Sequence, residues 1–284
     1  MIFWIASYPK SGNTWLRALL ASYYYTEDGL YDEGVIKYIG QFPEKNHFKN
    51  LSYDKNIVLD TTRLWLKAQE NINLEKKLRF FKTHNAFGKV NGNPFTDSKN
   101  SLGAIYIVRD PRNVITSLKN HYELSDDQAY NWMINEKNYI YDIHNFEKDG
   151  YSDFQFVSSW NTNYISWKIQ KQFPVKIVKY EDLLNETFLV FKDIVNFINI
   201  LNKNDKEINK EKLKKAVSST LFDKLKSIEQ KSGFSESLKS KKEDKKIPFF
   251  YLGPKNDWKK ILDINFAKKI EKVFEKNMKE LKYL

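Results

Sequence analysis

Short apolar runs alternate with amphipathic stretches along most of the chain. Runs of strand length occupy 2–6, 78–83, 104–108 and 175–180. Apolar positions at helical spacing predict helices over 13–25, 62–71, 111–122, 125–142, 152–172, 210–217 and 265–281, and a further helix that starts at 181. Because strands that alternate with helices form parallel crossovers, this pattern predicts an α/β fold in which helices flank both faces of a central parallel sheet.

The length of 284 residues favours one large domain over two independent ones. A polar stretch without clear periodicity begins near 232, and we expect a mobile lid loop at about 232–253. No apolar run approaches the roughly 18 residues of a membrane span. The first apolar run is too short for a secretory signal, and no basic region precedes it. We therefore expect a cytoplasmic protein without stable membrane insertion.

Side chains that commonly hold metal ions are scarce. The chain has no cysteine, and its four histidines show no ligand spacing; they are His47, His84, His121 and His144. We therefore expect no metal ion.

The formal net charge of +11 suits an anionic partner, which could be a nucleic acid, a membrane surface or a small molecule. Most of the surplus lysines follow residue 200 and are interleaved with Asn, Asp and Glu, as on solvated helix faces. Few aromatic residues accompany them, and a surface for single-stranded nucleic acid needs such residues. We expect no nucleic-acid partner, although a non-catalytic nucleic-acid-binding protein stays an alternative.

The segment 8–15 connects the first strand to the first helix and is the most informative part of the chain. A loop of this kind points backbone N–H groups and the positive end of a helix at one place, where a phosphate or sulfate group can bind. Lys10 adds a mobile cation, and Ser11 and Thr14 add hydroxyl donors. Nucleotidase phosphate loops place glycine directly before the lysine, whereas Pro9 stands there in this chain. An ATP-dependent phosphotransferase is therefore a second alternative.

Two further segments carry candidate chemistry. His84 follows the apolar run 78–83, and a neutral imidazole can take a proton from a hydroxyl near pH 7. Arg109 ends another strand, Asp110 and Pro111 are favoured at a helix start, and Ser117 lies about two helical turns further on. The guanidinium of Arg109 and the hydroxyl of Ser117 could converge on one phosphate.

These segments together resemble the sulfotransferases that use 3′-phosphoadenosine-5′-phosphosulfate (PAPS). Tyr-Pro-Lys-Ser-Gly-Asn-Thr-Trp at 8–15 is similar to their 5′-phosphosulfate loop, Lys-Thr-His at 82–84 to their catalytic segment, and 109–117 to their 3′-phosphate site. The order along the chain is that of the family. The resemblance implies a three-layer fold of the P-loop type, PAPS as the sulfuryl donor, and adenosine 3′,5′-bisphosphate (PAP) as the product.

The resemblance also implies roles for single residues. His84 is expected to act as the general base, with Lys10 and Lys82 as the other catalytic residues. The residues expected to bind PAPS are Lys10, Ser11, Gly12, Asn13, Thr14, Trp15, Arg109, Ser117, Tyr180, Thr220, Phe222, Gly253 and Lys255. Among these, Trp15, Tyr180, Thr220 and Phe222 belong near the adenine.

The chain departs from the family pattern at two places. Asn85 and Ala86 stand where the family often has Leu-Pro. Tyr251 and Leu252 stand where the C-terminal segment of the family has Arg and Lys, so that Lys255 is a candidate replacement for the missing contacts to the 3′-phosphate.

The reaction implied is in-line transfer of the sulfuryl group to a hydroxyl, or alternatively an amine, of a small molecule or of a glycan- or lipid-type acceptor. Phe42, Phe48 and Phe87 could line an apolar acceptor pocket or pack in the core, and the lysine excess hints at an anionic acceptor. A homodimer is one assembly that the sequence leaves open.

Overall fold

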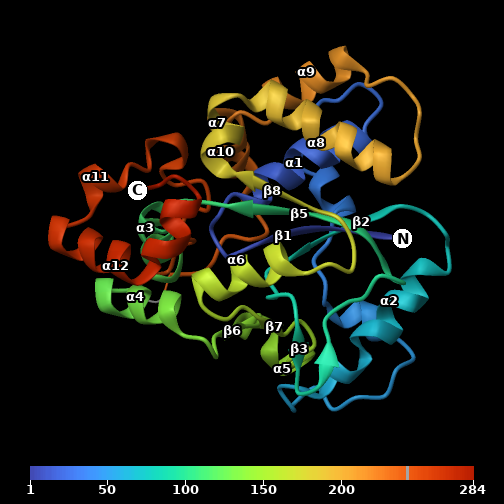
Figure 1. The fold of residues 1–284 in the computed structure, drawn as a ribbon, viewed down its shortest axis with the longest axis horizontal. Coiled ribbons are helices and arrows are strands. Elements are labelled where there is room, and N and C mark those ends of the chain that lie inside the picture. Colours follow the sequence, from blue (N-terminus) through green and yellow to red (C-terminus); the bar gives the residue numbers. More distant parts are fainter. Residues whose placement is uncertain (241–242) are drawn as a thin grey trace.

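The computed structural model describes residues 1–240 and 243–284. Its central sheet has four parallel strands in the order β2 (Arg79–Thr83), β1 (Ile2–Ser7), β5 (Ser101–Val108) and β8 (Val175–Lys179). Helices cover the sheet on both sides, which gives three layers (Figure 1). The predicted α/β fold with a flanked parallel sheet is therefore confirmed.

The burial of β1 shows why this sheet has two covered faces. Ile2, Trp4 and Ala6 pack in one apolar cluster, whereas Phe3 and Ile5 pack in another on the opposite face. All five side chains are fully buried. Successive residues of a strand point to opposite faces, so a continuous apolar run is what a strand needs when both faces are covered.

Two groups of helices make up the outer layers. The face that carries Trp4 is covered by α2 (Trp65–Asn73), α3 (Pro111–Tyr122), α4 (Asp126–Ile134), α6 (Trp160–Ile169) and α12 (Ile264–Glu280). The other face is covered by α1 (Asn13–Tyr25), α7 (Tyr180–Asn185), α8 (Thr187–Leu201) and α9 (Lys210–Ser219). In Figure 1, α1, α8 and α9 lie together above the sheet.

The remaining elements lie outside these two groups of helices. They are the helices α5 (Phe146–Asp149), α10 (Phe222–Ser232) and α11 (Trp258–Ile261), the 3-10 helices η1 (Val35–Tyr38), η2 (Lys45–Phe48), η3 (Asp60–Leu64), η4 (Ile143–Asn145) and η5 (Gly253–Lys255), and the hairpin strands β3 (Lys89–Val90), β4 (Asn93–Pro94), β6 (Tyr139–Ile140) and β7 (Gln155–Phe156). The sequence analysis did not anticipate α10 or the β6–β7 pair.

Two predicted helices are too long. The helix expected over 125–142 begins at its Ser125 capping box but ends at Ile134, because Asn135 is extended. The helix expected over 152–172 begins only at Trp160, where the Ser159 side chain caps it by accepting from the Thr162 N–H. Between them the antiparallel strands β6 and β7 pair, and the carbonyl of Asn138 accepts hydrogen bonds from two residues beyond β7.

The start of α3 agrees with the prediction and is reinforced by a buried ion-pair network. Asp110 accepts from the Arg112 N–H at 2.9 Å, and its carboxylate also binds the Arg112 guanidinium. Arg112 further contacts Glu271 on α12 and the carbonyl of Tyr283. The C-terminal helix is thereby tied to the loop that follows β5.

The predicted lid segment and the predicted lack of a membrane span can be compared with the structure only within the described residues. Residues 241 and 242 of the predicted lid segment 232–253 lie outside the described residues. In the remainder of the chain, no helix is both long enough and apolar enough to cross a membrane.

Candidate active site

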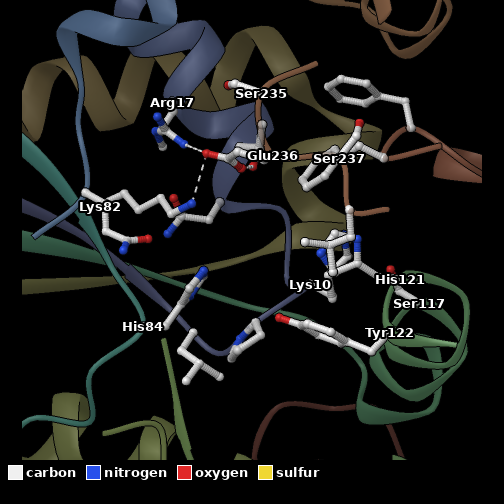
Figure 2. Close-up of a pocket in the computed structure, with 18 of the residues that line it drawn as sticks. Lys10, Arg17, Lys82, His84, Ser117, His121, Tyr122, Ser235, Glu236 and Ser237 are labelled. Carbon is white, nitrogen blue, oxygen red and sulfur yellow. Dashed lines mark hydrogen bonds and ion pairs between the residues drawn. The ribbon is translucent and has the colours of Figure 1, made fainter. Parts of the chain in front are cut away.

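A cavity of about 1290 Å³ opens at the carboxyl ends of the parallel strands. Its walls come from the loop after β1, the end of β2, the second half of α3, the β6–β7 hairpin, and the segments on either side of 241–242. The loop after β1 follows the same edge as Lys82 and His84 (Figure 2). Ligands of open α/β sheets bind at this edge.

The loop after β1 is held in one conformation by its own residues. Lys10 and Gly12 both have left-handed backbones, with φ of 64° and 102°. A Cβ at Gly12 would lie 2.5 Å from the ring of Tyr180, so only glycine lets the loop and this ring pack together. The Asn13 amide donates to the Ile5 carbonyl at 2.9 Å and to the Ser7 hydroxyl at 3.1 Å. Asn13 therefore anchors the start of α1 to β1.

His84 is oriented by hydrogen bonds to Ser7, Gln155 and Asn163, and its Nδ1 also lies 3.2 Å from the Ser7 hydroxyl oxygen. Its Nδ1 lies 2.8 Å from the Ser7 carbonyl oxygen, which can only accept, so Nδ1 carries the proton. Its backbone N–H donates to Gln155 Oε1 at 2.7 Å, and its carbonyl accepts from Asn163. Nε2 is left with a lone pair and has no partner among the described residues. His84 lines the cavity, so this lone pair is available to a ligand.

Burial, and secondarily the cationic Lys82, lower the pKa of His84 to about 3. The imidazole is therefore neutral near pH 7, which is the state that a general base requires.

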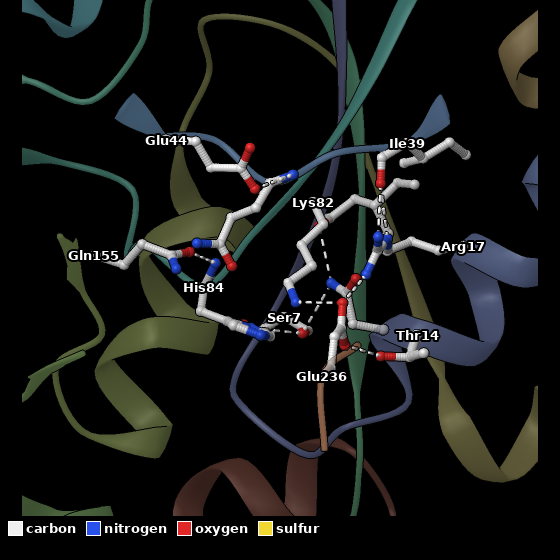
Figure 3. Close-up of polar contacts among 12 residues, drawn as sticks. Ser7, Thr14, Arg17, Ile39, Glu44, Lys82, His84, Gln155 and Glu236 are labelled. Atoms are coloured by element: carbon white, nitrogen blue, oxygen red, sulfur yellow. Dashed lines mark hydrogen bonds and ion pairs between the residues drawn. The ribbon is translucent and has the colours of Figure 1, made fainter. Parts of the chain in front are cut away.

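A carboxylate from a distant segment occupies the cationic part of the cavity (Figure 3). Glu236 accepts hydrogen bonds from Lys82 Nζ and from the Thr14 hydroxyl, both at 2.9 Å, and pairs with Arg17. Arg17 also donates to the Ile39 carbonyl through Nε and Nη2, at 3.1 and 2.7 Å. Although burial opposes ionisation, Lys82 and Arg17 together lower the pKa of Glu236 well below its ordinary value. The cluster is thus a site built for an anion.

Arg17 and Glu236 are the main functional candidates that the sequence analysis missed. Arg17 lies on the apolar face of α1, between Leu16 and Ala18, and a charge at such a position was a usable signal. Glu236 stands in a polar stretch and carries no comparable signal.

Lys10 is the second lysine of the site. Its Nζ lies 3.9 Å from the ring centre of Phe249, and it forms no ion pair within the described residues. Burial lowers the pKa of Lys10 to about 7, and the neighbouring Lys82 and Arg109 act in the same direction. A ligand phosphate at this position would restore the charge on the ammonium group.

Arg109 lies on the same side of the cavity as Lys10. Its guanidinium stacks 4.2 Å from the ring centre of Tyr180, Nη1 donates to the Lys10 carbonyl at 3.3 Å, and Nε is buried without a partner. Tyr180 meets Trp15 edge to face at 5.8 Å. Ser117, which also lines the cavity, extends this wall along α3.

Most of the expected site residues line this one cavity. They are Lys10, Gly12, Asn13, Thr14, Trp15, Lys82, His84, Arg109, Ser117, Tyr180, Phe222 and Gly253. Ser11 is fully buried beside it, and its hydroxyl has no partner.

The structure does not bring every expected residue to the cavity. Thr220 follows the last residue of α9 as its C-cap, and its buried hydroxyl donates to the Ala216 carbonyl at 2.8 Å. Lys255 is exposed and does not line the cavity, so the geometry gives no support to its role as a replacement cation. Phe42 and Phe48 are core residues, and Phe87 packs against Trp167.

Among the described residues, no group of three His, Cys, Asp or Glu side chains is arranged to hold a metal ion.

Three comparisons place the chain among known proteins. The model of the sulfotransferase domain family matches residues 2–282. Sulfotransferase 1 family member D1 of Mus musculus is 22% identical over 278 residues, which cover 97% of this chain and 83% of the relative. Luciferin sulfotransferase of Photinus pyralis is 24% identical over 267 residues, which cover 90% of this chain and 65% of the relative.

Solved structures give the same fold. A mouse sulfotransferase complexed with PAP superposes with a TM-score of 0.59 at 18% identity and covers 98% of this chain and 83% of its own. Retinol dehydratase in a complex with retinol and PAP gives a TM-score of 0.56 at 18% identity, with 98% and 81% covered. Because the family model matches almost the whole of this chain, the chain belongs to the sulfotransferase domain family and is a sulfotransferase.

Proposed function

We propose that the protein transfers the sulfuryl group of PAPS to a hydroxyl acceptor, with His84 as the general base. The observation that carries this proposal is the convergence on one cavity of a neutral, oriented imidazole and a set of cations. The structural relatives complexed with PAP support PAPS as the donor.

The residues of the donor side fit a doubly phosphorylated nucleoside. The carboxylate of Glu236 binds Thr14, Arg17 and Lys82, so these three side chains are already arranged to bind an anion. A phosphosulfate in place of this carboxylate would have the same three donors. The unpartnered Nε of Arg109 lies in a second cationic region, next to Tyr180 and near Ser117 on the cavity wall. We assign the 5′-phosphosulfate to the first region and the 3′-phosphate to the second.

The proposed step is an in-line displacement at sulfur. The acceptor oxygen bonds to sulfur while the bond between sulfur and the 5′-phosphate oxygen breaks, and His84 Nε2 takes the acceptor proton. Negative charge grows on the departing phosphate oxygen, where Lys10, Lys82 and Thr14 can stabilise it. One such donor often lowers the barrier by about 2.7–4 kcal/mol.

The low pKa of His84 is compatible with this role once the donor is bound. Burial is the main cause of the lowering and the cationic Lys82 is the second, and the negative charges of PAPS would offset that cation. The pKa of His84 should therefore rise toward a value suited to proton transfer.

The test is His84→Ala. We expect the variant to bind PAP with unchanged affinity in calorimetry and to lose about 10²–10⁴-fold in turnover with labelled PAPS. Unchanged PAP binding serves as the control for folding. Turnover within a few fold of the wild type would refute the assignment of His84 as base.

A further inference from the structure

The cavity has two ends of different chemistry, and His84 lies between them. Figure 3 shows Glu236 and Thr14 on one side of the imidazole, and Glu44 and Gln155 on the other. The second side is formed by the segment 40–46, which pairs with β2 at Lys82, and by the β6–β7 hairpin. Gln155 of β7 binds the backbone of His84 directly. An acceptor that presents its nucleophile to Nε2 would therefore rest on these two walls.

The charged groups of the acceptor end are predominantly acidic, and they lie beside Tyr139, Ile140, Tyr141 and Ile143 of the same wall. Its carboxylates are Glu44, Asp142, Asp149 and Asp153, and its cations are Lys37 and Lys45. Lys45 pairs with Asp149 at 2.8 Å, which neutralises one carboxylate. Of the lysines that follow residue 200, Lys239 and Lys246 line the cavity, and they belong to the segments on either side of 241–242 and not to these two walls.

Two buried polar atoms at this end have no partner. Ser152 is fully buried and lines the cavity, yet its hydroxyl makes no hydrogen bond. In Asp153, Oδ2 accepts from the Asp142 N–H at 2.8 Å, whereas Oδ1 is buried and unpartnered. Such atoms are uncommon in folded proteins and destabilise them unless a ligand completes them. An ionised carboxylate oxygen only accepts, so the missing group must be a hydroxyl or amino donor.

Apolar and anionic acceptors do not match these walls. Retinol and androsterone, which are named in the complexes of retinol dehydratase, are largely hydrocarbon. A ligand of that kind would leave the buried Asp153 Oδ1 and the Ser152 hydroxyl without hydrogen bonds, and an anion would be repelled by the carboxylates of Glu44 and Asp153.

We infer that the acceptor is an aliphatic molecule rich in hydroxyl or amino groups, of the sugar or amino-sugar type, bound between Glu44, Ser152 and Asp153. This inference rests on the proposed sulfuryl transfer from PAPS. Asp153 and Ser152 position the acceptor, and His84 takes the proton of one of its hydroxyls or amines.

The first experiment compares acceptor classes with labelled PAPS. Glucosamine, N-acetylglucosamine and glucose form one arm, and 4-nitrophenol and androsterone form the other. We expect kcat/KM for the best sugar to exceed that for either aromatic or sterol probe by at least about tenfold. A higher kcat/KM for 4-nitrophenol or androsterone, or no transfer to any sugar, overturns the inference. PAP binding is measured in parallel, because its absence, together with no transfer to either arm, would instead refute the proposed function.

The second experiment uses Asp153→Asn, with Asp205→Asn as the matched control. Asp205 is exposed in the loop between α8 and α9, outside the cavity. We expect Asp153→Asn to raise the KM for the best sugar about tenfold or more and to leave the affinity for PAP unchanged. An unchanged KM would overturn the inference.

The Ser152→Ala variant tests the same end of the cavity independently of any folding defect in the Asp153 variant. The Ser152 hydroxyl makes no hydrogen bond to any of the described residues, so we expect an unaltered melting temperature together with a several-fold higher KM for the sugar. An unaltered KM at this position would count against the inference in the same way.

Discussion

Lys82 Nζ donates to Glu236 Oε1 at 2.9 Å across 154 residues of sequence. The same carboxylate accepts from Thr14 and pairs with Arg17, so it lies where the proposed function puts the sulfuryl and 5′-phosphate groups. Two anions cannot share these donors, so binding of PAPS in the proposed position requires that it displace Glu236. The unliganded protein therefore competes with its own donor.

Glu236→Gln should bind PAP more tightly than the wild type. The amide keeps the size of the side chain but releases the cations of Lys82 and Arg17, and we expect the Kd to fall by roughly tenfold, or about 1.4 kcal/mol. Calorimetry measures the change, with Glu243→Gln as the control, because Glu243 is an exposed residue paired with Lys245. Weaker PAP binding in Glu236→Gln would show that the carboxylate helps to build the donor site.

Arg109→Ala should weaken the binding of PAP more than that of AMP. The proposed partner of Arg109 is the 3′-phosphate, which AMP lacks. Loss of a charge-assisted hydrogen bond of about 1.5–3 kcal/mol predicts an effect of about 10- to 100-fold on PAP. Lys255→Ala is the matched control, since Lys255 is exposed and lies off the cavity walls. Equal weakening of PAP and AMP would mean that Arg109 does not distinguish the extra phosphate.

The affinity for PAP should fall as the pH rises from 7 to 9. Burial lowers the pKa of Lys10 to about 7, so above this pH the free protein holds a neutral amine. PAP favours the ammonium form, and binding must then take up a proton, which reduces the affinity by up to about tenfold per pH unit. Lys10→Arg keeps its charge at every pH in this range and should flatten the profile. An equal slope in both proteins would assign the pH dependence to another group.

The parts of the fold that the sequence predicted well have strong local signals. The run 2–6 is apolar at every position, as a strand covered on both faces requires. Asp110 and Pro111 form a helix start signal, which depends on neighbouring residues alone. Lys10, His84 and Arg109 each follow a predicted strand, in motifs that resemble those of the family. The ends of parallel strands lie at one edge of the sheet, so these residues were predicted to lie there. Their convergence on one cavity follows from the parallel topology.

Features that depend on contacts between distant segments were not predictable. The pairing of Glu236 with Arg17 joins residues 219 positions apart, and nothing local marks either as a partner of the other. The sequence analysis assigned the residues of the β6–β7 hairpin to two helices. The second of these helices was predicted because Phe156, Trp160, Tyr164 and Trp167 stand at helical spacing. Its pairing depends on backbone hydrogen bonds between the two segments, which a local pattern does not reveal.

The last residues of the chain bear directly on how the protein can be engineered. The Tyr283 carbonyl accepts from Arg112, and the Tyr283 hydroxyl donates to Glu181, whose other oxygen accepts from the Asp110 N–H. Fusion partners or affinity handles joined after residue 284 would therefore pull on the loop that carries Arg109. For assays of donor binding, an affinity handle is better inserted in an exposed loop, such as the one around Asp205, than joined to this end.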